Sequence, residues 1–241
     1  MKSYWEENRP RILLFADIMG FKSLIGKIEH SNLVKQFRDF TNQLIKLIEP
    51  LKTGKHLRLT IFSDSIIIGA DSCTIKSFNL IVKAAAILMC ICHRFSLPIN
   101  GCIACGNLTF DVPENDEREV DVPIILGDSV VKAHLLNEDL FCYGIILHPS
   151  AEELLKSSLQ RKENKFQHPF FHIPIPLKSG GFARLNYLSW PSVHIPINNE
   201  KIKIEDEDKW LIEIEKNDIP RVRAYIHNTR EILSQIQNLK L

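Results

Sequence analysis

The sequence has no excess charge of either sign. Its 30 Lys and Arg residues are balanced by 29 Asp and Glu residues, so the 241-residue chain carries a formal net charge of only +1. A protein that holds nucleic acid through its phosphates, or that adheres to an anionic membrane, needs a basic surface. The charge balance therefore predicts a small molecule or a protein as partner, with no nucleic acid and no membrane.

Long apolar runs are also missing. The nearest approach, Leu80 to Cys92, is interrupted by Lys83 and falls short of the roughly 20 apolar residues that cross a bilayer. The N-terminal segment has charges on both sides of a short apolar run and no small-residue cleavage site, unlike a signal peptide. Six cysteines lie in or beside apolar segments, as free thiols do in a reducing compartment. We therefore expect a cytoplasmic protein.

One cysteine pair, Cys102 and Cys105, has the spacing of a zinc or redox motif. The pair falls within Pro98–Gly106, an apolar segment that predicts a strand. Residues three apart on a strand point to opposite faces of the sheet, so the two thiols cannot share a ligand. We predict two separate structural cysteines.

The order of the apolar patterns predicts an α+β protein: strand, helix, hairpin, helix, strand, strand, helix, strand. This order is typical of a mainly antiparallel sheet with helices on one face. We expect residues 1–160 to form this core, and residues 161–241 to be an extension of strands and a helix that packs on the core or on a dimer partner. The core segments are Arg11–Ala16, Ser31–Ile48, His56–Phe62 with Ser65–Gly69, Thr74–Phe95, Pro98–Gly106, Val122–Leu126, Gly127–Asn137 and Phe141–Leu147.

Two aspartates stand at strand ends in this arrangement. Asp17 follows the first strand, and Asp64 lies at the turn of the hairpin, so both carboxylates are expected at one edge of the sheet. Such charges repel each other unless a cation lies between them, and carboxylate oxygens are ligands that Mg²⁺ prefers. Two ions held in this way support phosphoryl transfer. The alternative, in which Asp17 caps a helix and Asp64 forms a turn, stays open on spacing alone.

The residues after Asp17 add a candidate phosphate site. The segment breaks at a glycine before the next helix, and the backbone amides of Met19, Gly20 and Phe21 would bind phosphate there. Serine nucleophiles are disfavoured, because Ser63 and Ser65 flank Asp64 and have no convincing His partner in the sequence.

Three local sequences resemble the motifs of class III nucleotide cyclases, in the order and spacing of that family. FADIMGFKSLIG (Phe15–Gly26) resembles the first metal motif, and TIFSDSIIIG (Thr60–Gly69) resembles the second. GDSVVKAHLL (Gly127–Leu136) resembles the helix start after the fourth-strand region. Within the superfamily, the sequence is most similar to the bacterial pyrimidine cyclases of Pycsar anti-phage defence, through FSDSIIIG, Pro98–Gly106, LNYLSW and YIHNTREIL. The resemblance spans nearly the whole chain.

The resemblance implies a ferredoxin-like sandwich and a pyrimidine nucleotide cyclase. UTP or CTP would be converted to 3′,5′-cyclic UMP or cyclic CMP and pyrophosphate, through attack of the 3′-hydroxyl on the α-phosphate. Asp17, Asp64 and the backbone carbonyl of Ile18 would hold two Mg²⁺ or Mn²⁺ ions. Family members are homodimers with sites at the interface, so Gly127 and the Lys132–His134 region would come from the partner. A separate effector would read the product as a second messenger during phage infection.

The base-reading positions differ from those of purine cyclases. Thr60 stands where those enzymes have a lysine, and Ile124 stands where they have an aspartate. These replacements argue against purine specificity, and a short hydroxyl is compatible with a smaller ring. Uracil and cytosine differ by an exchanged donor and acceptor, so the sequence leaves both open, with the uridylate cyclase favoured.

Other departures concern the transition state. Val131 and Leu135 replace an asparagine and an arginine of the purine cyclases, and Asn100 replaces a commonly basic residue. Because negative charge develops on the phosphate, another group must stabilise it. Each candidate also fits a solvated surface charge. The candidates are Lys132 and His134 on the helix, Lys22 and Arg58.

The same departures motivate a second hypothesis, a catalytically degenerate cyclase-homology domain that binds nucleotide or mediates dimerisation. The presence of both Asp17 and Asp64 favours the enzyme, because a scaffold has no physical need for two repelling carboxylates at one edge. A generic metal-dependent phosphohydrolase ranks last, because the sequence holds no additional Asp/His cluster.

Overall fold

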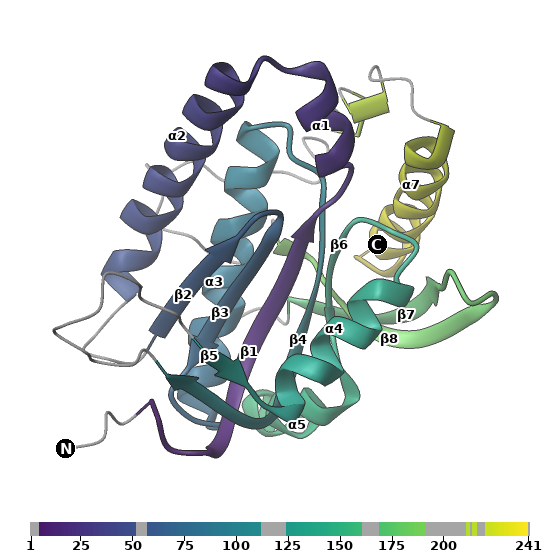
Figure 1. Ribbon diagram of the computed structural model, residues 1–241. Helices are drawn as coiled ribbons and strands as arrows, with labels where there is room; N and C mark the ends of the chain where they lie inside the picture. Colours follow the sequence, from purple (N-terminus) through teal and green to yellow (C-terminus); the bar gives the residue numbers. More distant parts are fainter. Residues whose placement is uncertain are drawn as a thin grey trace, which may run out of the picture.

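The computed structural model describes residues 5–51, 57–111, 124–160, 169–190 and 211–240, apart from 213 and 216–219. These residues form one mixed sheet with helices on both faces (Figure 1). The strand order is β2-β3-β1-β4-β6-β8-β7, and β5 pairs with the far end of β4. Every pair is antiparallel except β4 with β6. The predicted α+β class with a mainly antiparallel sheet is confirmed.

The elements follow the sequence patterns closely. The strands are β1 (Arg9–Ile18), β2 (Leu57–Phe62), β3 (Ser65–Ala70), β4 (Ile99–Asp111), β5 (Ile124–Leu126), β6 (Gly144–Leu147), β7 (Phe170–Pro176) and β8 (Phe182–Leu188). The helices are α1 (Phe21–Lys27), α2 (His30–Ile48), α3 (Ile75–Arg94), α4 (Asp128–Asp139), α5 (Glu152–Gln160) and α7 (Pro220–Lys240), with short 3₁₀ turns at Glu49–Leu51 and Pro149–Ala151.

Strand β1 lies at the centre of the sheet, between β3 and β4. Its alternate side chains enter two separate cores: Ile12 and Leu14 pack with α2 and α3, whereas Leu13 and Phe15 pack with α4. A strand that is buried on both faces has a continuous apolar sequence rather than an alternating one. This explains the unbroken apolar run that predicted the strand.

Helix α3 is apolar nearly all round and is buried against the sheet together with α2 and α5. By length and composition alone it could cross a membrane, the one such helix in the described part of the chain, so the expectation that no segment approaches that length is wrong. Its side chains nevertheless lie in the protein core, which is where an all-apolar helix of a globular protein packs. The helix begins after Thr74, whose hydroxyl accepts a hydrogen bond from the Ser77 amide at 3.3 Å.

Helix α4 lies on the opposite face of the sheet, in front of β1 and β4 in Figure 1. The expectation that all helices share one face therefore holds for α2, α3 and α5 but not for α4. The reason is the second apolar face of β1: Leu13 and Phe15 need a cover, and Val130, Ala133 and Leu136 of α4 provide it.

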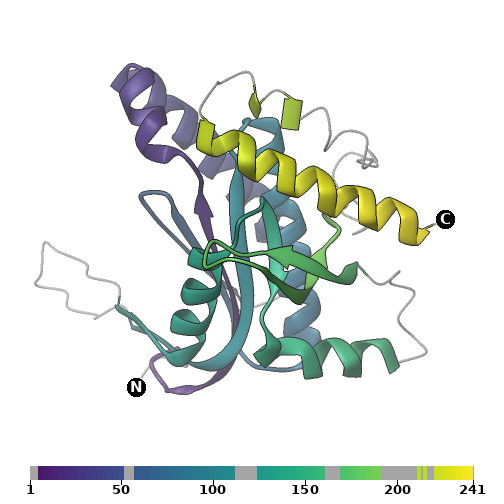
Figure 2. The same ribbon diagram turned by 90° about the vertical axis from the view of Figure 1, so that its right-hand side faces the viewer.

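The C-terminal segment continues the same sheet. Strand β8 pairs with β6, β7 pairs with β8, and α7 lies across β7 (Figure 2). Residues 161–168 and 191–210 of the expected extension lie outside the described residues.

The six cysteines are free, and all except Cys73 are buried. Cys102 packs in the core under α4, and Cys105 packs in the core under α3. The prediction that these two thiols point to opposite faces is confirmed.

Candidate active site

Asp17 and Asp64 meet at one edge of the sheet. Asp17 is the penultimate residue of β1 and pairs with Ser65 of β3 on one side and Asn100 of β4 on the other. The Ile18 amide donates a hydrogen bond of 2.9 Å to the Asp64 carbonyl, which fixes the hairpin turn beside the end of β1. The expected juxtaposition of the two aspartates is therefore present.

The carboxylate of Asp17 is held from both sides. Its Oδ1 accepts a hydrogen bond from the Ser65 hydroxyl at 2.6 Å, and its Oδ2 accepts one from the Asn137 side-chain amide at 3.2 Å. Burial raises the pKa of Asp17, and the charge of Asp64 raises it further. The hydrogen bonds from Ser65 and Asn137, together with His134, only partly counteract that increase in pKa.

The carboxylate oxygens of this site fit a divalent cation that keeps some water or phosphate ligands. Each Asp17 oxygen accepts one hydrogen bond and retains a second lone-pair position. No cluster of three or more His, Cys, Asp or Glu side chains suited to a metal occurs among the described residues, so the site is not an all-protein cage. Mg²⁺ is commonly held by one or two carboxylates and substrate phosphates. The Ile18 side chain is a hydrocarbon buried in the core, so only its backbone carbonyl could contribute a ligand.

The loop after Asp17 differs in part from the predicted phosphate site. The Met19 amide donates to the Pro98 carbonyl at 2.7 Å, so the expectation that it is free for a phosphate is wrong. The reason is that the chain leaves β1 alongside the start of β4. Gly20 adopts a left-handed conformation (φ 75°) that few other residues tolerate, and α1 begins at Phe21. Gly20 and Phe21 thus stand at the start of a helix, as predicted.

Two of the other predicted residues lie on the same face of the sheet as Asp17. Thr60 of β2 pairs with Ile67, which pairs with Phe15, so Thr60 shares the face that Phe15 presents to α4. His134 of α4 contacts the Phe15 ring edge-on, with a centroid distance of 5.2 Å. His134 is also close enough to lower the pKa of Asp17.

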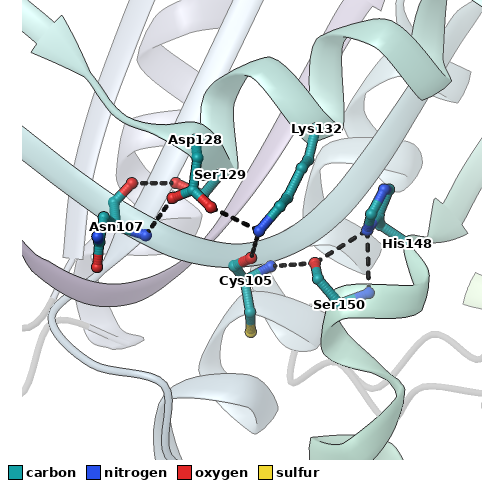
Figure 3. A network of polar contacts seen from close by, with 7 residues as sticks. All are labelled: Cys105, Asn107, Asp128, Ser129, Lys132, His148 and Ser150. Carbon is teal, nitrogen blue, oxygen red and sulfur yellow. Dashed lines mark hydrogen bonds and ion pairs between the residues drawn. The ribbon is translucent and has the colours of Figure 1, made fainter.

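Lys132 belongs instead to a network at the other end of α4 (Figure 3). Its ammonium lies 2.5 Å from Asp128 Oδ2 and 3.4 Å from the Cys105 carbonyl, and it lowers the pKa of Asp128. The Asn107 amide donates to Asp128 Oδ1 at 2.5 Å, and the Ser129 hydroxyl donates to the Asn107 carbonyl at 3.0 Å. The network fastens the first turn of α4 to β4.

One chain therefore does not bring all the predicted residues together. Ile124 pairs with Asp111 and Asp17 pairs with Asn100, at opposite ends of the 13-residue strand β4. Lys132 contacts the carbonyl of Cys105, at the middle of β4. Of the two remaining cationic candidates, Arg58 lies over the Trp5 ring at 5.7 Å, and Lys22 lies on α1.

Sequence reasoning missed two neighbours of Asp17. It considered Ser65 only as a nucleophile, although the pairing of the hairpin with β1 would have placed its hydroxyl beside Asp17. Asn137 lies 120 residues from Asp17 in sequence, and its contact depends on α4 crossing the other face of the sheet. No local pattern indicates that crossing.

Apolar side chains are exposed around this face. Val131 and Leu135, one turn apart on α4, are 56% and 59% exposed, and Phe62 at the end of β2 is 81% exposed. Ordinary surface helices place such side chains toward the core. The outer side of α4 thus carries two apolar groups that the core of this chain does not cover.

No model of a known protein family and no curated protein matches the sequence. Solved structures do match the fold. The guanylate cyclase domain of RhGC from Catenaria anguillulae, in complex with GTP, has a TM-score of 0.55 and 12% identity, over 74% of this chain and 95% of that one. A bacterial light-regulated adenylyl cyclase has a TM-score of 0.52 and 12% identity, over 86% of this chain and 99% of that one. The fold is that of a class III nucleotide cyclase domain.

Proposed function

We propose that the protein is a metal-dependent nucleotide cyclase that acts on a pyrimidine nucleoside triphosphate, UTP in preference to CTP. The observation that carries the proposal is the pair Asp17 and Asp64 at one sheet edge of a cyclase fold. The products would be the 3′,5′-cyclic nucleotide and pyrophosphate.

Asp17 and Asp64, with the Ile18 carbonyl, would hold two Mg²⁺ or Mn²⁺ ions. When bound, such ions favour ionisation of the 3′-hydroxyl and neutralise charge on the phosphates. Ser65 and Asn137 orient the Asp17 carboxylate through one hydrogen bond to each oxygen. Because the chain is nearly neutral, the ions and not a basic surface would meet the charge of the triphosphate.

We propose a homodimer with the sites at the interface. Ile124 lies at the opposite end of β4 from Asp17, and Lys132 contacts Cys105 at the middle of that strand, so we assign both residues to a site completed by a second chain. The exposed apolar side chains Val131 and Leu135 on α4 supply a surface that such a chain would cover. His134, beside Phe15, could stabilise phosphate charge.

The substrate class rests on Thr60 and Ile124, which cannot make the contacts of the lysine and aspartate in purine cyclases. Thr60 lies on the face of the sheet that holds Asp17 and offers one short hydroxyl to the base. By resemblance, the product is a second messenger for a separate effector in anti-phage defence, made in the cytoplasm.

The test is incubation with each of the four nucleoside triphosphates and Mn²⁺, with products resolved by mass. We expect cyclic UMP or cyclic CMP, and at least a hundredfold lower rate for Asp17→Ala and Asp64→Ala, because each removes a metal ligand. Asp71→Ala is the control, because Asp71 accepts a hydrogen bond from the Ser77 hydroxyl at the start of α3. The cyclase rate of this variant should match that of the wild type.

The degenerate cyclase-homology domain is the second candidate, favoured by the apolar side chains at positions 131 and 135. Nucleotide binding without cyclic product would support that candidate. A cyclic AMP or cyclic GMP product would contradict the roles given to Thr60 and Ile124.

A further inference from the structure

Two asparagines are buried beside the proposed metal site. Asn137 on α4 is 2% exposed and Asn100 on β4 is 1% exposed. The Asn137 side-chain amide donates to Asp17 Oδ2 at 3.2 Å, and the Asn100 side-chain amide donates to the Asn137 backbone carbonyl at 3.3 Å. The two residues therefore connect β4, the last turn of α4 and the Asp17 carboxylate in series.

Two asparagines are not the residues that would fill this buried position most stably. Burial of a side-chain amide is unfavourable unless both its donor and its acceptor are satisfied. The side-chain oxygens of both asparagines are buried without a hydrogen-bond partner among the described residues. Apolar side chains of similar shape would avoid that penalty, so the amides serve a purpose other than core packing.

The chemistry of the amide suits a supporting role toward a cation. It donates an N–H group to the carboxylate without adding positive charge, which would repel a metal ion. It also occupies only one lone-pair position of Asp17 Oδ2 and leaves the other position for the ion. Because Asn137 is almost fully buried, it can act on substrate or metal only through Asp17.

Asn100 in turn holds the backbone of Asn137 through a hydrogen bond. The carbonyl of Asn137 accepts the Leu140 amide at 3.3 Å where α4 ends, and the Asn100 side-chain amide is its second donor. This bond holds the final turn of α4 against β4, at the strand position that pairs with Asp17.

We propose that Asn137 is a positioning residue for the metal-binding carboxylate of Asp17, and that Asn100 positions Asn137. The inference rests on the proposed function only in taking Asp17 as a metal ligand. Loss of such a supporting hydrogen bond lowers metal affinity by about 10- to 100-fold in known metal sites.

The experiment measures Mn²⁺ affinity of the full chain from the electron paramagnetic resonance signal of free Mn²⁺. Asn137→Leu keeps the shape of the side chain and removes its N–H groups, and Asn137→Ala is a second variant should the first not fold. We expect Mn²⁺ binding to weaken about 10- to 100-fold. In cyclase assays the KM for Mn²⁺ should rise, while kcat at saturating Mn²⁺ stays near that of the wild type.

Asn186→Leu is the matched control. Asn186 is 8% exposed and donates to a carboxylate, Glu152 Oε1, at the same 3.2 Å, but it lies on β8 and does not contact Asp17. Its substitution should lower thermal stability and leave Mn²⁺ affinity unchanged.

The outcomes separate the inference from the proposed function. If Asp17→Ala weakens Mn²⁺ binding and both Asn137 variants bind Mn²⁺ like the wild type, the positioning role is overturned and the metal site stands. If Asp17→Ala binds Mn²⁺ as tightly as the wild type, the metal site itself is wrong, and the role of Asn137 is overturned with it.

Discussion

Asp17 is a carboxylate placed where its charge is unfavourable in the metal-free protein. Burial and the neighbouring charge of Asp64 raise its pKa above the ordinary value despite two donated hydrogen bonds. An acid with a raised pKa in the folded state binds its proton more tightly than in the unfolded chain. The free energy of unfolding of the metal-free protein is therefore larger at pH values below the unfolded pKa, and it falls as the pH rises through the folded pKa.

Removal of this charge should stabilise the metal-free protein. Asp17→Asn keeps a side chain that can accept from Asn137 and donate to Ser65, so we expect a higher melting temperature than the wild type at pH 7.5 with a chelator present. The difference should disappear below about pH 3, where the wild-type carboxylate is protonated in both states. Thermal unfolding at both pH values measures this, and a lower melting temperature for the variant at pH 7.5 would contradict it.

At the scale of elements, α4 determines how the site is built. Its first turn is attached to Asn107 of β4 through Ser129, and its last turn is attached to Asn100 of the same strand. Between these ends Ala133 is fully buried against the sheet. The small side chain allows the close approach that brings Asn137 to Asp17.

A larger side chain at this position should lift α4 from the sheet. Ala133→Leu is expected to reduce the free energy of unfolding by about 1–3 kcal/mol through overpacking. The same change should weaken Mn²⁺ binding, because it separates Asn137 from Asp17. Val34→Leu enlarges an exposed residue of α2, on the opposite face of the sheet from α4, so it should change the free energy of unfolding by less than about 0.5 kcal/mol. Urea unfolding measures both variants, and equal stability of the two would contradict the packing argument.

The pattern of apolar residues was sufficient to predict the elements and the meeting of Asp17 with Asp64, because strand order and a short hairpin fix where strand ends lie. It could not assign α4 to the second face, since β1 is apolar at every position from Ile12 to Ala16 and does not distinguish its faces. Without that assignment, Asn137 had no visible connection to Asp17. Sequence patterns report local periodicity, whereas this contact depends on the packing of two layers.

At the scale of the molecule, each chain presents Asp17 and Asp64 at one end of β4, Lys132 beside its middle and Ile124 at the other end. In a dimer with a two-fold axis, a residue i of one chain contacts a residue j of the other, and j of the first contacts i of the second. Such an axis can therefore bring the Asp17 end of each chain against a different part of its partner. The arrangement supports a dimer in which every site draws on both chains.

Charge on the outer side of α4 should therefore separate the chains. Leu135→Glu places a carboxylate at a position that is 59% exposed in one chain, so the fold of the chain should be retained. We expect a monomer in sedimentation experiments, with a wild-type circular dichroism spectrum and at least a hundredfold lower cyclase rate. Glu153→Gln on α5, on the opposite face of the sheet from α4, is the control and should remain dimeric. An active monomeric Leu135→Glu protein would contradict the shared site.

The attachment of α4 has a consequence for how such a protein can change over evolutionary time. The contacts that hold the helix use its two ends and its inner side, whereas Val131 and Leu135 on the outer side take no part in them. Substitutions at the outer positions can therefore accumulate without disturbing the fold or the carboxylate pair. The helix therefore separates the groups that hold one chain together from the apolar groups that are available for contact with a second chain.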